Sequence, residues 1–278
     1  MTWDSDVEVV GKRIEMKRKA LFYDIDGTLL SEITGEIPQS AQKALEKARE
    51  NGHLTFINTG RTVAGMPYEF KKMPFSGYVC GCGTYIQYGD AVLMTRHIPH
   101  ERGREIVRCI KAARADMILE GMEDCYLPER RSRFERLENT RRYFREMGLG
   151  IEHYAEDDGF DFDKFVVYTD EMTDKQMLFR NLERDMEIMD RQNGLYEVVP
   201  GEFSKASGIA FVLKHFGLEP EDAYVFGDSS NDLSMFRFVP HAAAMGNHDP
   251  VLDPYTEFVT KTVEQDGIEW AMRHYGLI

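Results

Sequence analysis

The fold of this chain is decided by the stretch Ala20-Leu-Phe-Tyr-Asp-Ile-Asp-Gly-Thr-Leu-Leu30. Its first four residues are apolar or aromatic and predict a short buried strand. Asp24 and Asp26 follow directly, two positions apart, and a Gly-Thr turn comes next. In an open parallel α/β sheet, ligands bind just beyond the carboxyl ends of the strands. Two carboxylates at such an end are suited to Mg2+, because this cation prefers hard carboxylate oxygens and bridges to substrate phosphate.

Two other interpretations of the Asp-x-Asp-Gly pattern have to be weighed. The pattern could be a polar turn that ends a strand, since Asp and Gly favour turns. It could also be a calcium-binding EF-hand loop. With Gly27 at the invariant glycine position, however, the first and last ligand positions fall on Phe22 and Ile33, whose side chains cannot bind calcium. This stretch alone leaves the turn and the catalytic acid pair open.

A helix and a second strand follow the acidic turn. Pro38 begins the helix and Gly52 ends it, which are the places that these residue types favour. The run His53-Leu-Thr-Phe-Ile57 predicts a strand, so the three elements form a βαβ unit with a parallel sheet and a right-handed crossover. The strand ends in Asn58-Thr-Gly-Arg61. Its Thr hydroxyl and Gly N–H could hold a phosphate oxygen, although an ordinary turn uses the same residues.

The middle of the chain differs in character from the segments on either side. It carries much of the charge, and its capping box Thr173-Asp-Lys-Gln176 predicts a helix that runs to Gly194. Short strands are expected at Ala91–Met94, Met117–Leu119 and Phe165–Tyr168. The simplest organisation is an α/β protein with a Rossmann-like parallel-sheet core and an inserted α+β cap domain. We expect residues 1–18 to be an N-terminal extension, 19–84 and 197–278 the core, and 85–196 the inserted cap.

After the insertion the chain returns to the pattern of its first part. A helix is expected after Ser204-Lys205, a strand at Ala223-Tyr-Val-Phe226, and a last strand at Ala242–Met245. The cluster Gly227-Asp-Ser-Ser-Asn-Asp232 directly follows the second of these elements. Because the carboxyl ends of parallel strands meet at one edge of the sheet, we expect three polar clusters and one lysine to gather there: Asp24 with Asp26, Thr59 with Gly60, Asp228 with Asn231 and Asp232, and Lys205.

Charge and cysteine content limit the possible partners and the compartment. The net charge is −14, from 34 Lys and Arg against 48 Asp and Glu, so the surface repels nucleic acid and anionic membranes. No apolar run is long enough to span a membrane. The four cysteines lack a zinc-site spacing and are expected to be reduced thiols of a cytoplasmic protein. Because the net charge is negative, a negatively charged small substrate would need a metal ion or a lysine in the site to offset its charge.

Phosphoryl transfer is the chemistry that needs this set of groups, because its catalysis consists mainly of positioning and charge stabilisation. In this interpretation Asp24 is the nucleophile that forms an aspartyl-phosphate. Asp26 is the general acid and then the general base. Asp228 completes the Mg2+ site, and Lys205 offsets the negative charge of the carboxylate and phosphoryl oxygens. Asp232 is expected to orient Lys205 or a metal-bound water from outside the ligand shell.

The same residues, in the same order, resemble the four motifs of the haloacid dehalogenase-like hydrolases. The matching pieces are Asp24-Ile-Asp-Gly-Thr-Leu29, Thr59-Gly-Arg61, Lys205 and Gly227-Asp-Ser-Ser-Asn-Asp232. The place of the insertion and the tail Glu264-Gln-Asp-Gly-Ile268 resemble the Cof-type branch, which has an α/β cap between the second and third motifs. Cys82-Gly-Thr84 departs from the Asn-Gly-Ala that this branch has at the cap entrance, which concerns substrate contacts more than the chemistry.

The resemblance implies a role for each matching residue. Asp24, the backbone carbonyl of Asp26, and Asp228 would bind Mg2+. The phosphate would be held by the backbone of Ile25 together with four further residues: Thr59, Gly60, Lys205 and Asn231.

The expected function is a Mg2+-dependent phosphatase of small phosphorylated metabolites, with sugar phosphates as the substrate class. Two alternatives stay open: a phosphomutase of similar build, and a regulator that binds a phosphometabolite without turning it over. The sequence indicates neither the metabolite nor the oligomeric state.

Overall fold

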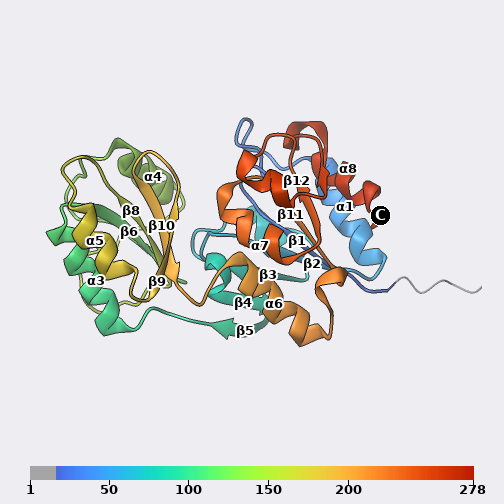
Figure 1. Cartoon of the computed structure of the whole chain (residues 1–278). Helices are drawn as coiled ribbons and strands as arrows, with labels where there is room; N and C mark the ends of the chain where they lie inside the picture. The colour runs from blue at the N-terminus through green and yellow to red at the C-terminus, as the bar shows by residue number, and fades with distance from the viewer. Residues whose placement is uncertain (1–16) are drawn as a thin grey trace, which may run out of the picture.

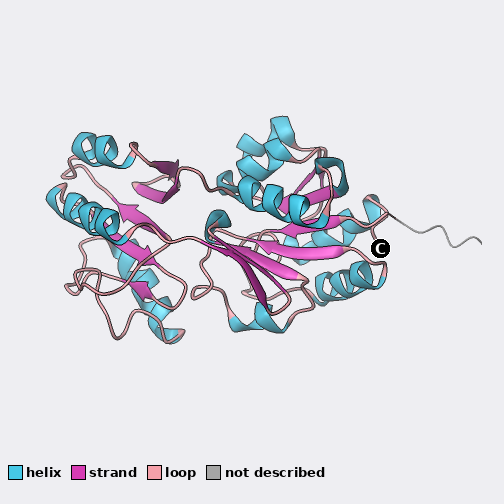
Figure 2. Ribbon diagram, turned by 90° about the horizontal axis from the view of Figure 1, so that it is seen from below, coloured by secondary structure: helices cyan, strands magenta, loops and turns pink. Residues whose placement is uncertain are grey.

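The computed structural model describes residues 17–278, which fold around two β-sheets (Figure 1). Residues 1–16, most of the expected N-terminal extension, lie outside the described residues. The smaller sheet and its helices stand beside the larger one in Figure 1 and again in Figure 2, where the molecule is turned by 90°. Two short connections, residues 96–99 and 201–204, join the two parts. The predicted α/β architecture with an inserted second domain is confirmed.

The large sheet has eight strands, and its central strand is β1 (Ala20–Tyr23), the stretch quoted first. Six neighbouring strands run parallel, and the last two, β4 and β5, are antiparallel. The strand order across the sheet is β13 (Phe258–Val259), β12 (His241–Ala244), β11 (Ala223–Gly227), β1, β2 (Leu54–Asn58), β3 (Gly77–Cys80), β4 (Tyr85–Tyr88) and β5 (Ala91–Thr95).

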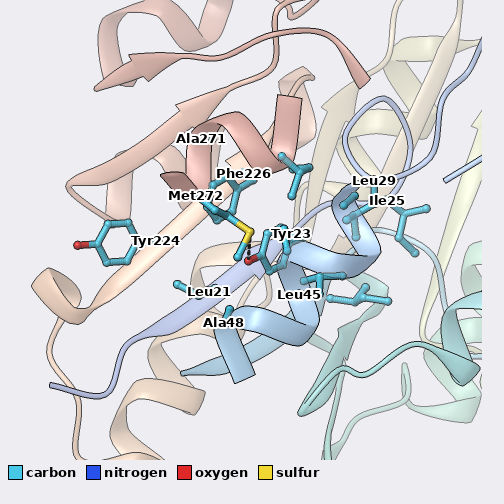
Figure 3. Packing of buried hydrophobic residues seen from close by; sticks show 14 of the residues in the cluster. Leu21, Tyr23, Ile25, Leu29, Leu45, Ala48, Tyr224, Phe226, Ala271 and Met272 are labelled. Atoms are coloured by element: carbon cyan, nitrogen blue, oxygen red, sulfur yellow. Dashed lines mark hydrogen bonds between the residues drawn. The ribbon is translucent and has the colours of Figure 1, made fainter. Parts of the chain in front are cut away.

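Helices cover both faces of the large sheet, which explains why β1 is apolar at every position. Tyr23 faces one layer, where its ring stacks on Phe226 at 4.6 Å and its hydroxyl meets Met272 (Figure 3). Phe22 points to the opposite face and stacks on Phe56 at 5.5 Å. The first layer consists of α1 (Gln39–Glu50) and α8 (Gly267–His274), and the second of α6 (Lys205–Phe216) and α7 (Leu233–Phe238). The short helix α2 (Tyr68–Lys72) follows β2.

The small sheet is antiparallel and carries helices that leave part of one face open. Its strand order is β7 (Cys125–Tyr126), β6 (Asp116–Glu120), β8 (Lys164–Tyr168), β10 (Leu195–Pro200) and β9 (Met186–Asp190). One face packs on α3 (His100–Ala112) and α5 (Lys175–Leu182), and the other packs partly on α4 (Glu135–Glu146). Because side chains alternate between faces, Glu120, Lys164 and Glu197 lie on the same face as α4.

Two predictions about the elements are wrong: the length of one helix and which strand is the last. The helix expected to run to Gly194 ends at Leu182, and Met186–Asp190 forms strand β9 instead. The residue that caps the N-terminus of this helix, α5, is Asp174, whose carboxylate accepts a hydrogen bond from the Met177 N–H at 3.0 Å. The apolar spacing fits a helix, but pairing with β10 determines the actual structure of the second half. The strand expected to be the last one, β12, is followed by β13.

The strand pairings also place the ends of the insertion differently from the sequence analysis. Strands β4 and β5, expected in the cap, extend the large sheet, and β10 belongs to the small sheet as far as Pro200. We therefore propose that the inserted cap comprises residues 96–200.

All four cysteines are free. Within residues 17–278, none of the helices has the length and apolar character needed to cross a membrane.

Candidate active site

The carboxyl ends of β1, β2 and β11 meet at one edge of the large sheet, because these three strands are parallel neighbours. A cavity of about 330 Å3 opens there, between this edge and the open face of the small sheet. Six predicted site residues line it: Asp24, Asp26, Thr59, Gly60, Asp228 and Asn231. Lys205 and Asp232 lie directly behind this lining and contact it. The four separate pieces of sequence therefore converge in one place.

Lys205 joins two of these pieces. Its ammonium nitrogen lies 2.7 Å from Oδ1 of Asp24 and 2.6 Å from Oδ1 of Asp232. Ser204 caps helix α6 and so places Lys205 in the first turn, with its side chain fully buried. Burial alone would lower the pKa of Lys205, but Asp232 and Asp24 outweigh burial and hold that pKa above its ordinary value. The lysine therefore carries a permanent positive charge beside Asp24.

Asp24 and Asp228 both have pKa values raised above the ordinary value of an aspartate. Burial raises the pKa of Asp24 to about 7, with Lys205 opposing the shift and Asp232 and Asp26 adding to it. Burial, with Asp232 and Asp24 nearby, raises the pKa of Asp228 to about 8. The side chains of Asp24, Asp228 and Asp232 each place an oxygen within 4.8 Å of the others. This set of hard oxygen donors, with one lysine against three carboxylates, fits a divalent cation such as Mg2+.

Asp232 is bound on both carboxylate oxygens by other groups of the protein. Oδ1 accepts a hydrogen bond from Lys205, and Oδ2 accepts from the backbone N–H groups of Asp228 at 2.9 Å and Ser229 at 3.1 Å. These contacts favour a positioning role for Asp232, outside the ligand shell. The predicted ligands are the carboxylates of Asp24 and Asp228 with the backbone carbonyl of Asp26.

Hydrogen-bond donors for a phosphate lie at the same edge. Among the described residues, the backbone N–H groups of Ile25 and Gly60 have no protein acceptor. Asn231 accepts hydrogen bonds on Oδ1 from Ser229 and Lys205, which leaves its amide NH2 group available. Free N–H groups at a strand end form a pocket that favours an anion. This arrangement is what the predicted phosphate contacts of Ile25, Gly60 and Asn231 require.

Arg61, which the sequence analysis left without a role, holds Asp26. Its guanidinium donates two hydrogen bonds to the carboxylate, at 2.8 Å to Oδ2 and 2.7 Å to Oδ1. It also donates to the hydroxyl of Tyr143, on helix α4 of the cap, at 3.0 Å. Each oxygen of Asp26 thus accepts one hydrogen bond from Arg61, and this two-point contact fixes the orientation of the carboxylate.

Three charged cap residues that the sequence analysis missed face the same cavity. Lys164 donates to the carbonyl of Gly60 at 3.0 Å and to Glu197 at 2.5 Å, and its nitrogen lies 3.4 Å from Glu120. All three side chains are buried. Only the pairing of β6, β8 and β10 brings them together, and no sequence motif marks that pairing.

Gly27 is the residue of the first motif that tolerates no side chain. Its φ is +75°, and a Cβ there would lie 2.4 Å from Oδ2 of Asp228. We expect Gly27→Ala to cost about 1–3 kcal/mol of stability from backbone strain and also to displace Asp228. Gly52 is the matched control, since its φ is +87° but a Cβ there would meet nothing within 4 Å.

Melting temperatures and Mg2+ titrations of phosphate release check this prediction. Both variants should lose comparable stability, whereas only Gly27→Ala should need more Mg2+ for half-maximal activity. Equal Mg2+ requirements in the two variants would contradict the proposed contact between Gly27 and the Asp228 carboxylate.

Comparison with known proteins shows one consistent similarity. Residues 21–272 match a family model described as haloacid dehalogenase-like hydrolase. A putative bifunctional phosphatase/peptidyl-prolyl cis-trans isomerase of Streptococcus pyogenes is 29% identical over 99% of this chain, which spans only 57% of that protein. The putative phosphatase YkrA of Bacillus subtilis is 25% identical, over 95% of this chain and 100% of that protein.

A solved structure shows the same arrangement of core and cap. It is described as the HAD subclass IIB sugar phosphatase BT4131 and superposes with a TM-score of 0.79 at 26% identity. The match covers 94% of this chain and 100% of the other.

Proposed function

This chain belongs to the haloacid dehalogenase-like hydrolases, and from that premise we propose that it is a Mg2+-dependent phosphatase of small phosphorylated metabolites. The family predicted from the four motifs is confirmed by the match over residues 21–272. The observation that carries the proposal is the contact of Lys205 with both Asp24 and Asp232 at the carboxyl ends of β1 and β11. It places a buried cation beside the carboxylate that would attack phosphorus.

The proposed reaction has two steps, both on Asp24. In the first, a carboxylate oxygen of Asp24 attacks phosphorus, the ester P–O bond breaks, and the leaving oxygen takes a proton from Asp26. In the second, Asp26 takes a proton from water, which attacks phosphorus and releases inorganic phosphate and the Asp24 carboxylate. Lys205 and the N–H groups of Ile25 and Gly60 would hold the phosphoryl oxygens. Bound Mg2+ would offset the charge that develops on those oxygens.

The proposed substrate class is phosphorylated sugars and related polyols. The cavity has room for a small molecule, and the cap lines one side of it with Glu120, Lys164 and Glu197. Buried carboxylates of this kind accept hydrogen bonds from hydroxyl groups. The structurally similar protein BT4131 is described as a sugar phosphatase, which supports the same class.

A panel of phosphorylated metabolites assayed with Mg2+ and with EDTA tests the proposal. We expect release of inorganic phosphate that depends on Mg2+ and is lost with EDTA. Transfer of the phosphoryl group to a second hydroxyl of the same sugar would instead identify a phosphomutase. Tight binding without any turnover would identify a regulator.

The metal site should also show itself in stability at different pH values. The pKa values of Asp24 and Asp228 are raised to about 7 and about 8, whereas an aspartate in the unfolded chain has a pKa of about 4. Because the folded protein holds these protons more tightly, the free energy of unfolding of the metal-free protein falls as pH rises from about 4 through these values. Mg2+ binds only the ionised forms and relieves their repulsion. We therefore expect Mg2+ to raise the melting temperature more at pH 9 than at pH 6.

Thermal melts with and without Mg2+ at the two pH values measure this effect. Asp228→Asn is the informative variant, because it removes a predicted ligand and should largely abolish the Mg2+-dependent shift. A shift of equal size at both pH values would contradict the assignment of these two carboxylates as ligands.

A further inference from the structure

Among residues 17–278, the cavity is lined by one cationic side chain that has no carboxylate partner within 4.0 Å. Arg61 is paired with Asp26, Lys164 with Glu197, and Lys205 with Asp24. Arg191 also lines this cavity. Within residues 17–278, its guanidinium makes no ion pair within 4.0 Å and donates no hydrogen bond, and its Nη1 atom is buried without an acceptor.

The backbone around Arg191 is firmly held. Arg191 lies in the tight turn between β9 and β10, and its N–H donates to the carbonyl of Leu195 at 2.9 Å. The Leu195 N–H also donates to the carbonyl of Gln192 at 3.2 Å, which makes Asn193 and Gly194 the two central residues of the turn. Both have positive φ, of 53° and 74°, as a tight hairpin turn requires. Asp190 and Tyr196 pair on either side of the turn. The arginine is therefore presented by a defined hairpin and not by a long loop.

The positive charge of Arg191 acts on Glu197, one of the buried cap residues that line the cavity. Burial would raise the pKa of Glu197, but Lys164 first and Arg191 second outweigh burial and lower that pKa to about 2. Leu195 and Val166 line the cavity together with Arg191 and add apolar surface to the cap side. An arginine without an acceptor is costly in such surroundings, since a buried donor that loses water and finds no partner destabilises the protein.

We propose that Arg191 is a specificity residue that binds a second oxyanion, a carboxylate or a phosphate, on the part of the substrate that leaves. The inference rests on the proposed phosphatase function. The scissile phosphate occupies the Asp24 side of the cavity, so an oxyanion at Arg191 belongs to the other end of the same molecule. The planar guanidinium matches the two oxygens of a carboxylate or phosphate. Sugar-acid phosphates and sugar bisphosphates carry such a second oxyanion, and monophosphates of uncharged sugars do not.

Two matched pairs of substrates test the proposal with the full-length protein and Mg2+. In the first pair, 6-phosphogluconate and sorbitol 6-phosphate differ only in a carboxylate against a hydroxymethyl group at the far end. In the second pair, fructose 1,6-bisphosphate carries a second phosphate that fructose 6-phosphate lacks. We expect the wild-type protein to prefer the anionic member of at least one pair by about 10- to 100-fold in kcat/KM, the range of a charged hydrogen bond. The preferred pair tells carboxylate from phosphate.

The variant Arg191→Met should remove that preference. The kcat/KM for the member with the second anionic group should fall by about 10- to 100-fold, mainly through KM, while the kcat/KM for the member with a single phosphate changes little. Arg184→Met is the matched control, because Arg184 is a cap arginine that pairs with Glu105 away from the cavity. This control should leave both members of each pair unchanged.

The outcomes separate this inference from the function on which it rests. Hydrolysis without preference for the anionic members, or an equal loss for both members in Arg191→Met, would overturn the role of Arg191 and leave the phosphatase assignment intact. Absence of phosphate release from all four compounds would count against the proposed substrate class and the inference together.

Discussion

Replacing Asp24 by asparagine is expected to abolish phosphate release, with a loss in kcat of about 10^4-fold or more, as for other enzymes that lose their nucleophile. Asparagine has nearly the same shape as aspartate, but its neutral amide does not attack phosphorus to form an acyl phosphate. The change also removes one predicted Mg2+ ligand and one of the two carboxylate partners of Lys205. Asp232 remains to hold Lys205 at 2.6 Å, so the protein should still fold.

A second buried aspartate provides the control for this experiment. Asp222 precedes β11 at the opposite end of the sheet and is paired with Lys19 at 2.9 Å. The variant Asp222→Asn should lower the melting temperature and leave turnover near the wild-type value. Measurements of phosphate release and melting temperature on both variants distinguish chemistry from folding. Turnover of Asp24→Asn within tenfold of the wild type would remove Asp24 as the nucleophile.

The gathering of the predicted site residues at one edge of the large sheet could be predicted, because each motif can be recognised in the local sequence. Asp24, Thr59 and Asp228 each stand directly after an apolar strand, and parallel pairing then carries all three to one edge. Carboxylates and a lysine at one edge are the groups that phosphoryl transfer needs, so the residue types also indicate the class of reaction. The glycine at position 27 is likewise explained by its positive φ and the close approach of Asp228.

The cap could not be predicted in the same way, because its important contacts are not local. Lys164 and Glu197 are 33 positions apart and meet only when β8 and β10 pair. The segment Met186–Asp190 shows the same difficulty, since its apolar spacing suits a helix while its pairing with β10 makes it a strand. Arg191 follows that segment in the hairpin turn, so its position depends on the same pairing.

Replacing Lys205 by methionine is expected to remove both activity and stability. Lys205 is fully buried and neutralises Asp24 and Asp232, so its loss leaves two buried carboxylates without a cation, a change that typically costs about 3–5 kcal/mol. The loss should depend on pH. Without the lysine, the pKa of Asp24 rises further above its value in the unfolded chain, so the variant is least impaired at low pH and its deficit grows as pH rises.

Comparison with a second buried lysine separates catalysis from stability. Lys164 is as deeply buried and is paired with Glu197 and Glu120, so Lys164→Met should lower stability by a similar amount. Its nitrogen contacts the carbonyl of Gly60, whereas that of Lys205 contacts the carboxylate proposed to attack phosphorus. At a temperature where both variants are folded, Lys205→Met should therefore retain far less turnover than Lys164→Met. Equal turnover in the two variants would mean that Lys205 serves folding alone, and the phosphoryl group would need another source of positive charge.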